Sequence, residues 1–250
     1  AFSRGAVRVD SGVREGDSIS PWYDPMIAKV IVHGANRPAA LNLLATTLSE
    51  VRVAGTTTNL EFLTALARHE GFAAGEVDTG LIGRDLASLT ARPPMSTAIP
   101  ALAALAALGS LNGDRGNDPW NLLTGWRAWS DAEDFVTLRL GEQVVHMRIL
   151  HLGQHRYQAS ADNLDCTLTI AQSRDGVVHF DSDGLRSKAE IVPRARSISV
   201  FHDGYCDKFE LVDDLAVAES KVAGGDSIMA PMPGLVSAVR TKVGAVVRTG

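Results

Sequence analysis

Three histidines in the middle of the chain are the most obvious candidates for binding a metal ion. His146, His151 and His155 lie close together in the sequence, and neutral imidazole is a common metal ligand. The residues around them are typical of a β-strand followed by a turn. Side chains along a strand point alternately to opposite faces. We therefore expect these histidines to be divided between two faces, and we predict no metal site.

Acidic residues and nucleophiles give no clearer sign of catalysis. Asp213-Asp214 and the group Asp131, Glu133 and Asp134 could supply paired carboxylates for acid–base chemistry. Both groups lie next to turns, and we interpret them as solvated. The chain contains no nucleophile elbow and no Gly-rich phosphate loop of the GxGxxG or Walker type. No catalytic residue is predicted in this segment.

Charge and cysteine content exclude several classes of protein. The formal net charge is -5 and no block of like charges occurs, so we predict no nucleic-acid partner and no anionic membrane surface. No apolar run approaches the roughly 18 residues that a membrane span needs. Cys166 and Cys206 lie far apart without CxxC or zinc spacing. We interpret them as buried or half-buried free thiols of a reducing compartment.

Residues 1–92 alternate between strand and helix patterns, which indicates an α+β fold. Two strand-like runs come first, at residues 6–9 and 26–33, and Gly34 ends the second. Caps, a proline and apolar spacing at i, i+3, i+4 then predict three helices. The first follows Asn36 and Pro38, the second runs from a Thr58 cap to about His69, and the third, capped by Asp78 or Thr79, spans residues 81–90. A short strand is expected at Val51–Val53.

Residues 93–213 have a different pattern. Pro100 begins an Ala- and Leu-rich helix, Ala101–Leu108, with almost no polar face, so it should be buried on most sides. Short alternating runs separated by Asp-Gly turn pairs then predict an eight-stranded antiparallel barrel or sandwich. The runs are Phe135–Leu140, Val144–Leu150, Arg156–Ala161, Asp165–Ile170, Val177–Phe180, Leu185–Val192, Ser197–Phe201 and Cys206–Leu211. The apolar helix is the obvious filler for such a barrel.

The last part of the chain carries a proline–glycine turn followed by a strand-like alternation. After a linker at 214–225, residues 226–250 contain Pro231, Met232, Pro233 and Gly234, then Leu-Val-Ser-Ala-Val. This segment resembles the start of a biotinyl carrier domain, a β-sandwich, and those four residues match its entry turn. The resemblance implies a truncated biotinyl domain at 226–250.

The head of the chain resembles the C-terminal part of an ATP-grasp-type biotin carboxylase. The similarity rests on three stretches: Val7–Val13 with Pro21–Lys29, Gly55–Leu63 and Asp78–Ile82. Tyr23-Asp24-Pro25 is interpreted as a structural turn without a catalytic role. Arg8 matches a position at the biotin carboxylase dimer contact, and is otherwise a plain surface arginine.

Three segments in this order, at 1–92, 93–213 and 226–250, resemble the layout of alpha subunits of biotin-dependent acyl-CoA carboxylases. The middle segment is similar to their subunit-bridging BT domain, a long helix inside an eight-stranded barrel. Asp118–Trp120 and Gly125–Arg127 look most like 3-methylcrotonyl-CoA carboxylases, with geranyl-CoA and propionyl-CoA carboxylases next. Trp120, Trp126 and Trp129 are expected to pack in a core. Trp120, Trp126 and Arg127 are also candidate contacts with a beta subunit.

The resemblance implies a ligase that uses ATP, bicarbonate and Mg²⁺ (or Mn²⁺) to carboxylate biotin. A beta subunit would then transfer the carboxyl group to an acyl-CoA. It also implies other alpha subunits and biotin protein ligase as partners. None of the five lysines lies between two methionines, so the biotinylated lysine is expected beyond Gly250, and the phosphate-binding residues before Ala1. This segment alone is therefore expected to bind no cofactor and to be catalytically incompetent.

Two other classes of function compete with this interpretation. A stand-alone barrel could enclose a small apolar ligand, in which case the helix would lie outside an empty lumen. The barrel could also be a subunit-bridging scaffold without catalysis. Localisation by family habit would be cytoplasmic in bacteria and the mitochondrial matrix in eukaryotes.

Overall fold

The computed structural model describes residues 7–19, 26–111, 127–162 and 164–212. It begins with an antiparallel hairpin of β1 (Val7–Ser11) and β2 (Ala28–Val32). Val7 and Val9 face one side with Val30 and Val32, while the other side carries Arg8, Asp10 and Lys29 together with Ile31. None of the ten strand residues is fully buried, because a two-stranded hairpin has only one sheet face to pack.

Four helices follow the hairpin: α1 (Arg37–Glu50), α2 (Leu60–Arg68), α3 (Glu70–Ala74) and α4 (Leu81–Leu89). The turn into α1 requires a glycine, because a Cβ on Gly34 would lie 2.5 Å from the backbone nitrogen of Ala40. The predicted cap of α1 is confirmed, since the Asn36 side chain accepts a hydrogen bond from the backbone N–H of Ala39 at 2.9 Å.

Several local predictions for this region are wrong. Val51–Val53 is not a strand: Val51 caps the end of α1 in an extended conformation, and the next residues lead directly to α2. β-branched residues favour extended backbone, but a strand also needs a hydrogen-bonded neighbour. Asn59 precedes α2 in place of Thr58, and makes no side-chain cap. The short α3, capped by His69, was not predicted.

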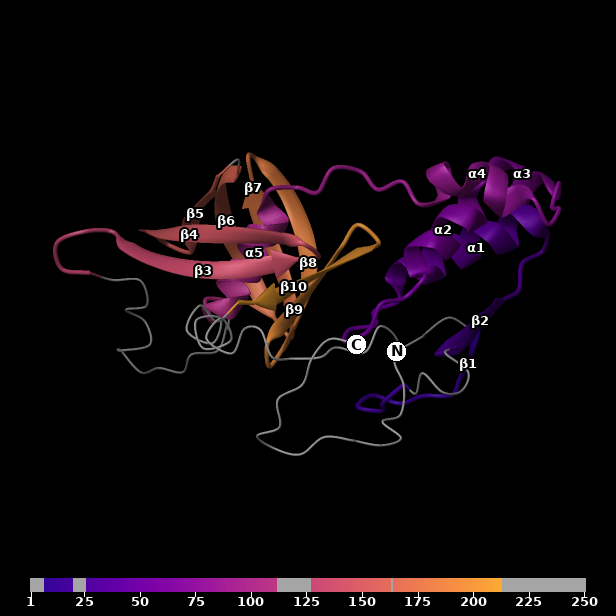
Figure 1. Cartoon of the computed structure of the whole chain (residues 1–250), viewed down its shortest axis with the longest axis horizontal. Helices are drawn as coiled ribbons and strands as arrows, with labels where there is room; N and C mark the ends of the chain where they lie inside the picture. Colours follow the sequence, from indigo (N-terminus) through magenta and orange to yellow (C-terminus); the bar gives the residue numbers. More distant parts are fainter. Residues whose placement is uncertain (1–6, 20–25, 112–126, 163, 213–250) are drawn as a thin grey trace, which may run out of the picture. The chain divides into compact units, whose positions relative to one another are not determined.

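The eight predicted strands are confirmed and form a closed antiparallel barrel in the order β10-β3-β4-β5-β6-β7-β8-β9 (Figure 1). Their bounds are β3 (Ala132–Leu140), β4 (Gln143–Gly153), β5 (Arg156–Ala161), β6 (Leu164–Arg174), β7 (Val177–Ser182), β8 (Leu185–Arg194), β9 (Ser197–His202) and β10 (Tyr205–Leu211). The pairing of the last strand with the first, which closes the barrel, is short: β10 pairs with β3 only at Glu210 and Leu211. The first part of β10 therefore pairs with β9 alone.

Three Asp-Gly pairs turn the chain between neighbouring strands. In Asp175-Gly176, Asp183-Gly184 and Asp203-Gly204 both residues have positive φ, from 48° to 52° at Asp and from 79° to 85° at Gly. This conformation is the type I′ turn, whose twist matches that of a hairpin. The predicted hairpin turns at these three pairs are confirmed.

Helix α5 (Ala98–Ala107) fills the barrel. It contacts strands all around the wall, namely β3, β4, β6, β8, β9 and β10, and Ala101 to Leu105 are completely inaccessible to solvent. An eight-stranded barrel is only wide enough for side chains, so a helix fits because most of its residues are alanine. Strand β6 hydrogen-bonds to the chain just before α5 and shortly after it. The Cys166 thiol donates to the Thr97 carbonyl, and the Ser173 hydroxyl donates to the Leu111 carbonyl.

Candidate functional site

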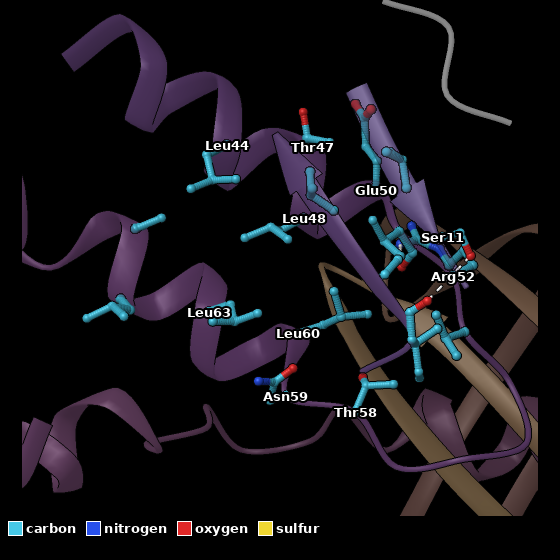
Figure 2. A pocket seen from close by; sticks show the side chains of 18 of the residues that line it. Ser11, Leu44, Thr47, Leu48, Glu50, Arg52, Thr58, Asn59, Leu60 and Leu63 are labelled. Atoms are coloured by element: carbon cyan, nitrogen blue, oxygen red, sulfur yellow. Dashed lines mark hydrogen bonds between the residues drawn. The ribbon is translucent and has the colours of Figure 1, made fainter. Parts of the chain in front are cut away.

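An apolar groove of about 1140 Å³ lies between the β1–β2 hairpin and helices α1 and α2. Figure 2 shows Leu44 and Leu48 of α1 and Leu60 and Leu63 of α2 lining it. At the other side, the Ser11 hydroxyl donates to the Val13 and Ile27 carbonyls. Its polar lining includes Thr58 and Asn59 before α2, and an ion pair of 3.4 Å between Arg52, just after α1, and Glu190 of β8. The apolar part of this lining suits contact with polypeptide or an apolar group.

Arg8 lies on the charged face of the same hairpin, directly across from Ile31. Its side chain is 73% exposed and donates two hydrogen bonds of 2.8 Å to the Asp10 carboxylate. The hydrogen bond from Arg8 holds the pKa of Asp10 below its ordinary value, and the same contact raises the pKa of Arg8. Lys29 lies directly across from Asp10. Arg8 is therefore a charged, outward-facing group, and its predicted place in a dimer contact stays a prediction.

The barrel interior rules out one of the alternative functions. The lumen of a ligand-binding barrel would be empty, with α5 outside. Here α5 and the inward side chains of the strands form one continuous core, which includes Leu102, Leu138, Ile149 and Phe209. The small-ligand interpretation is therefore wrong.

The three histidines are divided as strand alternation requires. His151 points toward the inside, where its Nε2 lies 2.8 Å from Asp134 and its ring meets Tyr157 edge-on. His146 is outward and contacts Thr137, while His155 occupies a turn with φ of 57°. In the part of the chain that the structure describes, no three His, Cys, Asp or Glu side chains are arranged to hold a metal ion.

Both cysteines are free thiols, as predicted, one buried and one half-buried. Burial raises the pKa of each to about 11. At Cys206 the neighbouring Asp207 and Glu61 carboxylates add to this effect. Neither thiol is therefore activated as a nucleophile at neutral pH.

Only one of the candidate subunit contacts around residue 120 can be placed. Arg127 donates a 3.0 Å hydrogen bond to the Glu133 carbonyl at the start of β3. Trp120 and Trp126 lie outside the described residues, as do the four predicted entry-turn residues Pro231, Met232, Pro233 and Gly234. The core prediction is wrong for Trp129, which is 99% exposed.

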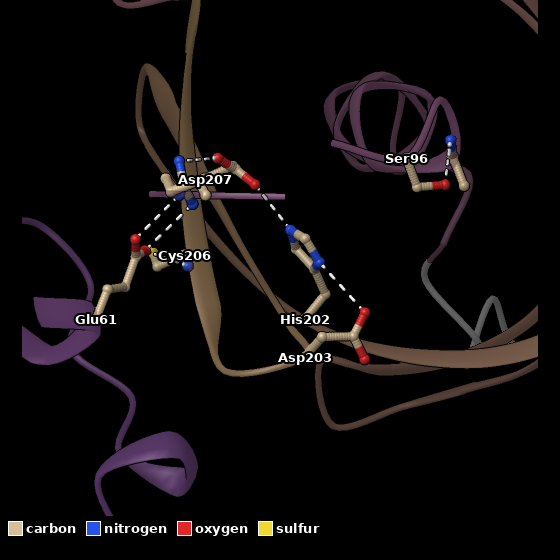
Figure 3. A network of polar contacts seen from close by, with 8 residues as sticks. Glu61, Ser96, His202, Asp203, Cys206 and Asp207 are labelled. Carbon is tan, nitrogen blue, oxygen red and sulfur yellow. Dashed lines mark hydrogen bonds and ion pairs between the residues drawn. The ribbon is translucent and has the colours of Figure 1, made fainter. Parts of the chain in front are cut away.

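A polar cluster at one end of the barrel was not predicted. Figure 3 shows Asp207 of β10 beside His202, with Glu61 of α2 on the other side. The Arg92 guanidinium hydrogen-bonds to both Asp207 and Glu61. These residues come from three separate parts of the chain, at Glu61, at Arg92 and at 202–207. No local pattern pairs a helix carboxylate with a strand carboxylate, so sequence alone offered no signal.

Two families match successive parts of the chain. Residues 2–84 match the biotin carboxylase C-terminal domain. Residues 96–214 match the methylcrotonyl-CoA carboxylase alpha-subunit BT domain, and the helix-filled barrel is the architecture expected for it. The chain carries these two domains. The first match covers the hairpin, α1 to α3 and the beginning of α4, and the second covers α5 and the barrel.

Two curated relatives align with nearly the whole chain. The chain is 30% identical over 98% of its length to the mitochondrial methylcrotonoyl-CoA carboxylase subunit alpha of Dictyostelium discoideum, and covers 37% of that protein. It is 27% identical over 98% of its length to the mitochondrial propionyl-CoA carboxylase alpha chain of Caenorhabditis elegans, again covering 37%. The chain thus spans little more than a third of these relatives.

Among solved structures, a single-chain, multi-domain long-chain acyl-CoA carboxylase matches 88% of the chain and 19% of its own length. The identity is 23% and the TM-score is 0.35. Within the described residues, no helix combines the length and the apolar character needed to cross a membrane.

Proposed function

We propose that the chain is part of the alpha subunit of a biotin-dependent acyl-CoA carboxylase, most similar to the methylcrotonyl-CoA enzymes. The observation that supports this most strongly is the succession of a biotin carboxylase C-terminal domain and a helix-filled BT barrel on one chain. The two domains differ in architecture, so chance similarity of one fold would not explain both. Domain limits of 1–92, 93–213 and 226–250 belong to the same proposal, with 214–225 as linker.

In this proposal the intact subunit uses ATP, bicarbonate and Mg²⁺ or Mn²⁺ to carboxylate biotin, and a beta subunit transfers the carboxyl group to an acyl-CoA. We assign the described residues a structural role in this subunit: the hairpin and helices complete the carboxylase, and the filled barrel bridges subunits.

The partners proposed for the alpha subunit are the beta subunit, other alpha subunits and biotin protein ligase, and the barrel is proposed to hold the beta subunit. Exposed Phe135 and Trp129 near the start of β3, together with Arg127, suit a protein contact. Cellular placement would be the cytoplasm of a bacterium or the mitochondrial matrix of a eukaryote.

Size-exclusion chromatography with the methylcrotonyl-CoA carboxylase beta subunit tests the bridging role. We expect the chain to co-elute with beta, and Phe135→Asp with Trp129→Asp to weaken association. Leu185→Asp, an equally exposed apolar position on β8, is the matched control. Failure of the unchanged chain to associate would remove the bridging role.

The substrate is tested on the intact alpha subunit. A streptavidin blot should detect biotin, and the assembled enzyme should carboxylate 3-methylcrotonyl-CoA in preference to propionyl-CoA or geranyl-CoA. The similar identities to methylcrotonyl and propionyl relatives make propionyl-CoA the second candidate. Absence of biotin would contradict the carboxylase itself, whereas a propionyl-CoA preference would change only the substrate.

A further inference from the structure

The Arg92 guanidinium, in the segment between α4 and α5, contacts two carboxylates at once. Arg92 Nη1 lies 3.1 Å from Asp207 Oδ1 of β10, and its Nε and Nη2 lie 3.0 and 3.2 Å from the two oxygens of Glu61 on α2. The guanidinium also stacks over the Tyr205 ring at 5.3 Å from the centroid. Arg92 therefore contacts a helix of the first domain and a strand of the second.

Asp207 needs this contact because it is only 3% exposed. An ionised carboxylate in such a place is costly unless it is paired and hydrogen-bonded. His202 Nε2 lies 2.7 Å from one of its oxygens, and Arg92 binds the other. His202 is in turn 3.7 Å from Asp203 in the turn before β10. Both oxygens of Asp207 are thus satisfied, one by the barrel and one by the incoming segment.

Glu61 extends the contact to the backbone of the barrel. Its Oε1 accepts a 3.2 Å hydrogen bond from the Cys206 N–H. This N–H lies in the first part of β10, which β3 does not reach. The Glu61 carboxylate of α2 thus accepts a backbone hydrogen bond at the edge of β10 that does not pair with β3.

A second set of contacts joins the same two regions. Arg52, just after α1, lies 3.4 Å from Glu190 of β8 and stacks over Phe201 of β9 at 5.5 Å. At the β9–β10 turn, a Cβ on Gly204 would meet the Ser49 Cβ at 3.3 Å. The Pro93-Pro94 pair that follows Arg92 is stiff, so an anchored Arg92 also directs the segment that leads into α5.

We propose that Arg92, shared between Glu61 and Asp207, is an electrostatic joint that couples local opening of α2 to opening of the β9–β10 end of the barrel. The joint lies outside every residue assigned to biotin, ATP or subunit contacts, and its function does not depend on the proposed enzyme activity. It makes Arg92 a positioning residue between two domains.

Hydrogen exchange with mass spectrometry on the complete 250-residue chain tests the joint. In Arg92→Gln we expect exchange to accelerate roughly tenfold or more both in α2 and at the Cys206 amide, because charge-assisted hydrogen bonds are lost on both sides. The matched control is Arg148→Gln, which breaks a pair with Glu133 of similar exposure on the barrel wall. It should leave both segments unchanged.

Glu61→Ala provides the second measurement and keeps the test valid if Arg92→Gln does not fold. It leaves the Arg92–Asp207 contact in place, so the barrel core around Ile149 should exchange as before. The Cys206 amide loses its contact with Glu61 and α2 loses its contact through it, so both should exchange faster. Acceleration confined to β9 and β10 in Arg92→Gln, or unchanged exchange at Cys206 and in α2 in Glu61→Ala, would overturn the joint.

Discussion

The barrel and the hairpin–helix region differ in how completely they bury their own apolar surface. The barrel encloses a continuous core that includes five successive residues of α5 with no exposure at all. In the hairpin–helix region every strand residue keeps some exposure, and a groove of about 1140 Å³ remains beside α1 and α2. The comparison shows that the barrel encloses a complete core, whereas the first region leaves part of its apolar surface exposed in a groove.

The largest effect is expected from removing the centre of the barrel core. Leu102→Ala should lower the free energy of unfolding by about 2–5 kcal/mol, because a fully buried leucine in a closed lumen leaves a cavity that its neighbours cannot fill. Chemical denaturation measures this change. Leu185→Ala, on an exposed position of β8, should change stability by less than about 0.5 kcal/mol; an equal loss in both would show that the helix does not support the barrel.

Substituting two turn glycines that have nearly equal φ angles tests how tightly the barrel wall is packed around each. Gly176 and Gly184 have φ of 79° and 81°, but a Cβ on Gly176 would lie 2.9 Å from the Ile191 carbonyl oxygen, whereas a Cβ on Gly184 would meet nothing. Gly184→Ala should cost about 1–2 kcal/mol from the left-handed backbone. Gly176→Ala should cost more in the same melting experiment, and equal costs would contradict the clash.

A substitution in the groove should cost less than one in the barrel. Leu63→Ala, on the side of α2 that lines the groove, should lower stability by about 1 kcal/mol, because the leucine is only partly removed from water. Denaturant unfolding compares it with Leu102→Ala. A loss as large as that of Leu102→Ala would show that the first region is packed as completely as the barrel.

Acidification should produce the smallest change in stability. The group responsible should be Asp207, on β10 at the end of the barrel near Arg92. Burial alone would raise the pKa of Asp207, but hydrogen bonds from His202 and Arg92 and their charges bring it below its ordinary value. A carboxyl group with a lowered folded pKa stabilises the protein above its unfolded pKa of about 3.9, and this contribution is lost as pH falls through the folded value. The Tm should therefore fall below about pH 4. In Asp207→Asn this part of the pH dependence should be absent, and an unchanged profile would exclude Asp207 as its source.

Sequence patterns predicted the barrel more accurately than the first region. All eight strands were located, Arg156–Ala161 with its observed bounds, because strict alternation and Asp-Gly turns are local signals. Predictions failed where a neighbour decides the outcome. Val51–Val53 has strand-forming residues without a partner strand, and Trp129 has the character of a core residue but is exposed.

By itself, the sequence determined the order of elements, the hairpin turns, the apolar nature of α5 and the resemblance to carboxylase domains, because each depends on residues near one another in the chain. Only the tertiary structure decided that β10 closes on β3 through two residue pairs, and that Arg92 meets both Glu61 and Asp207. Those contacts join residues 31 and 115 positions apart. Their formation depends on where the folded backbone places each charge, which no local pattern encodes.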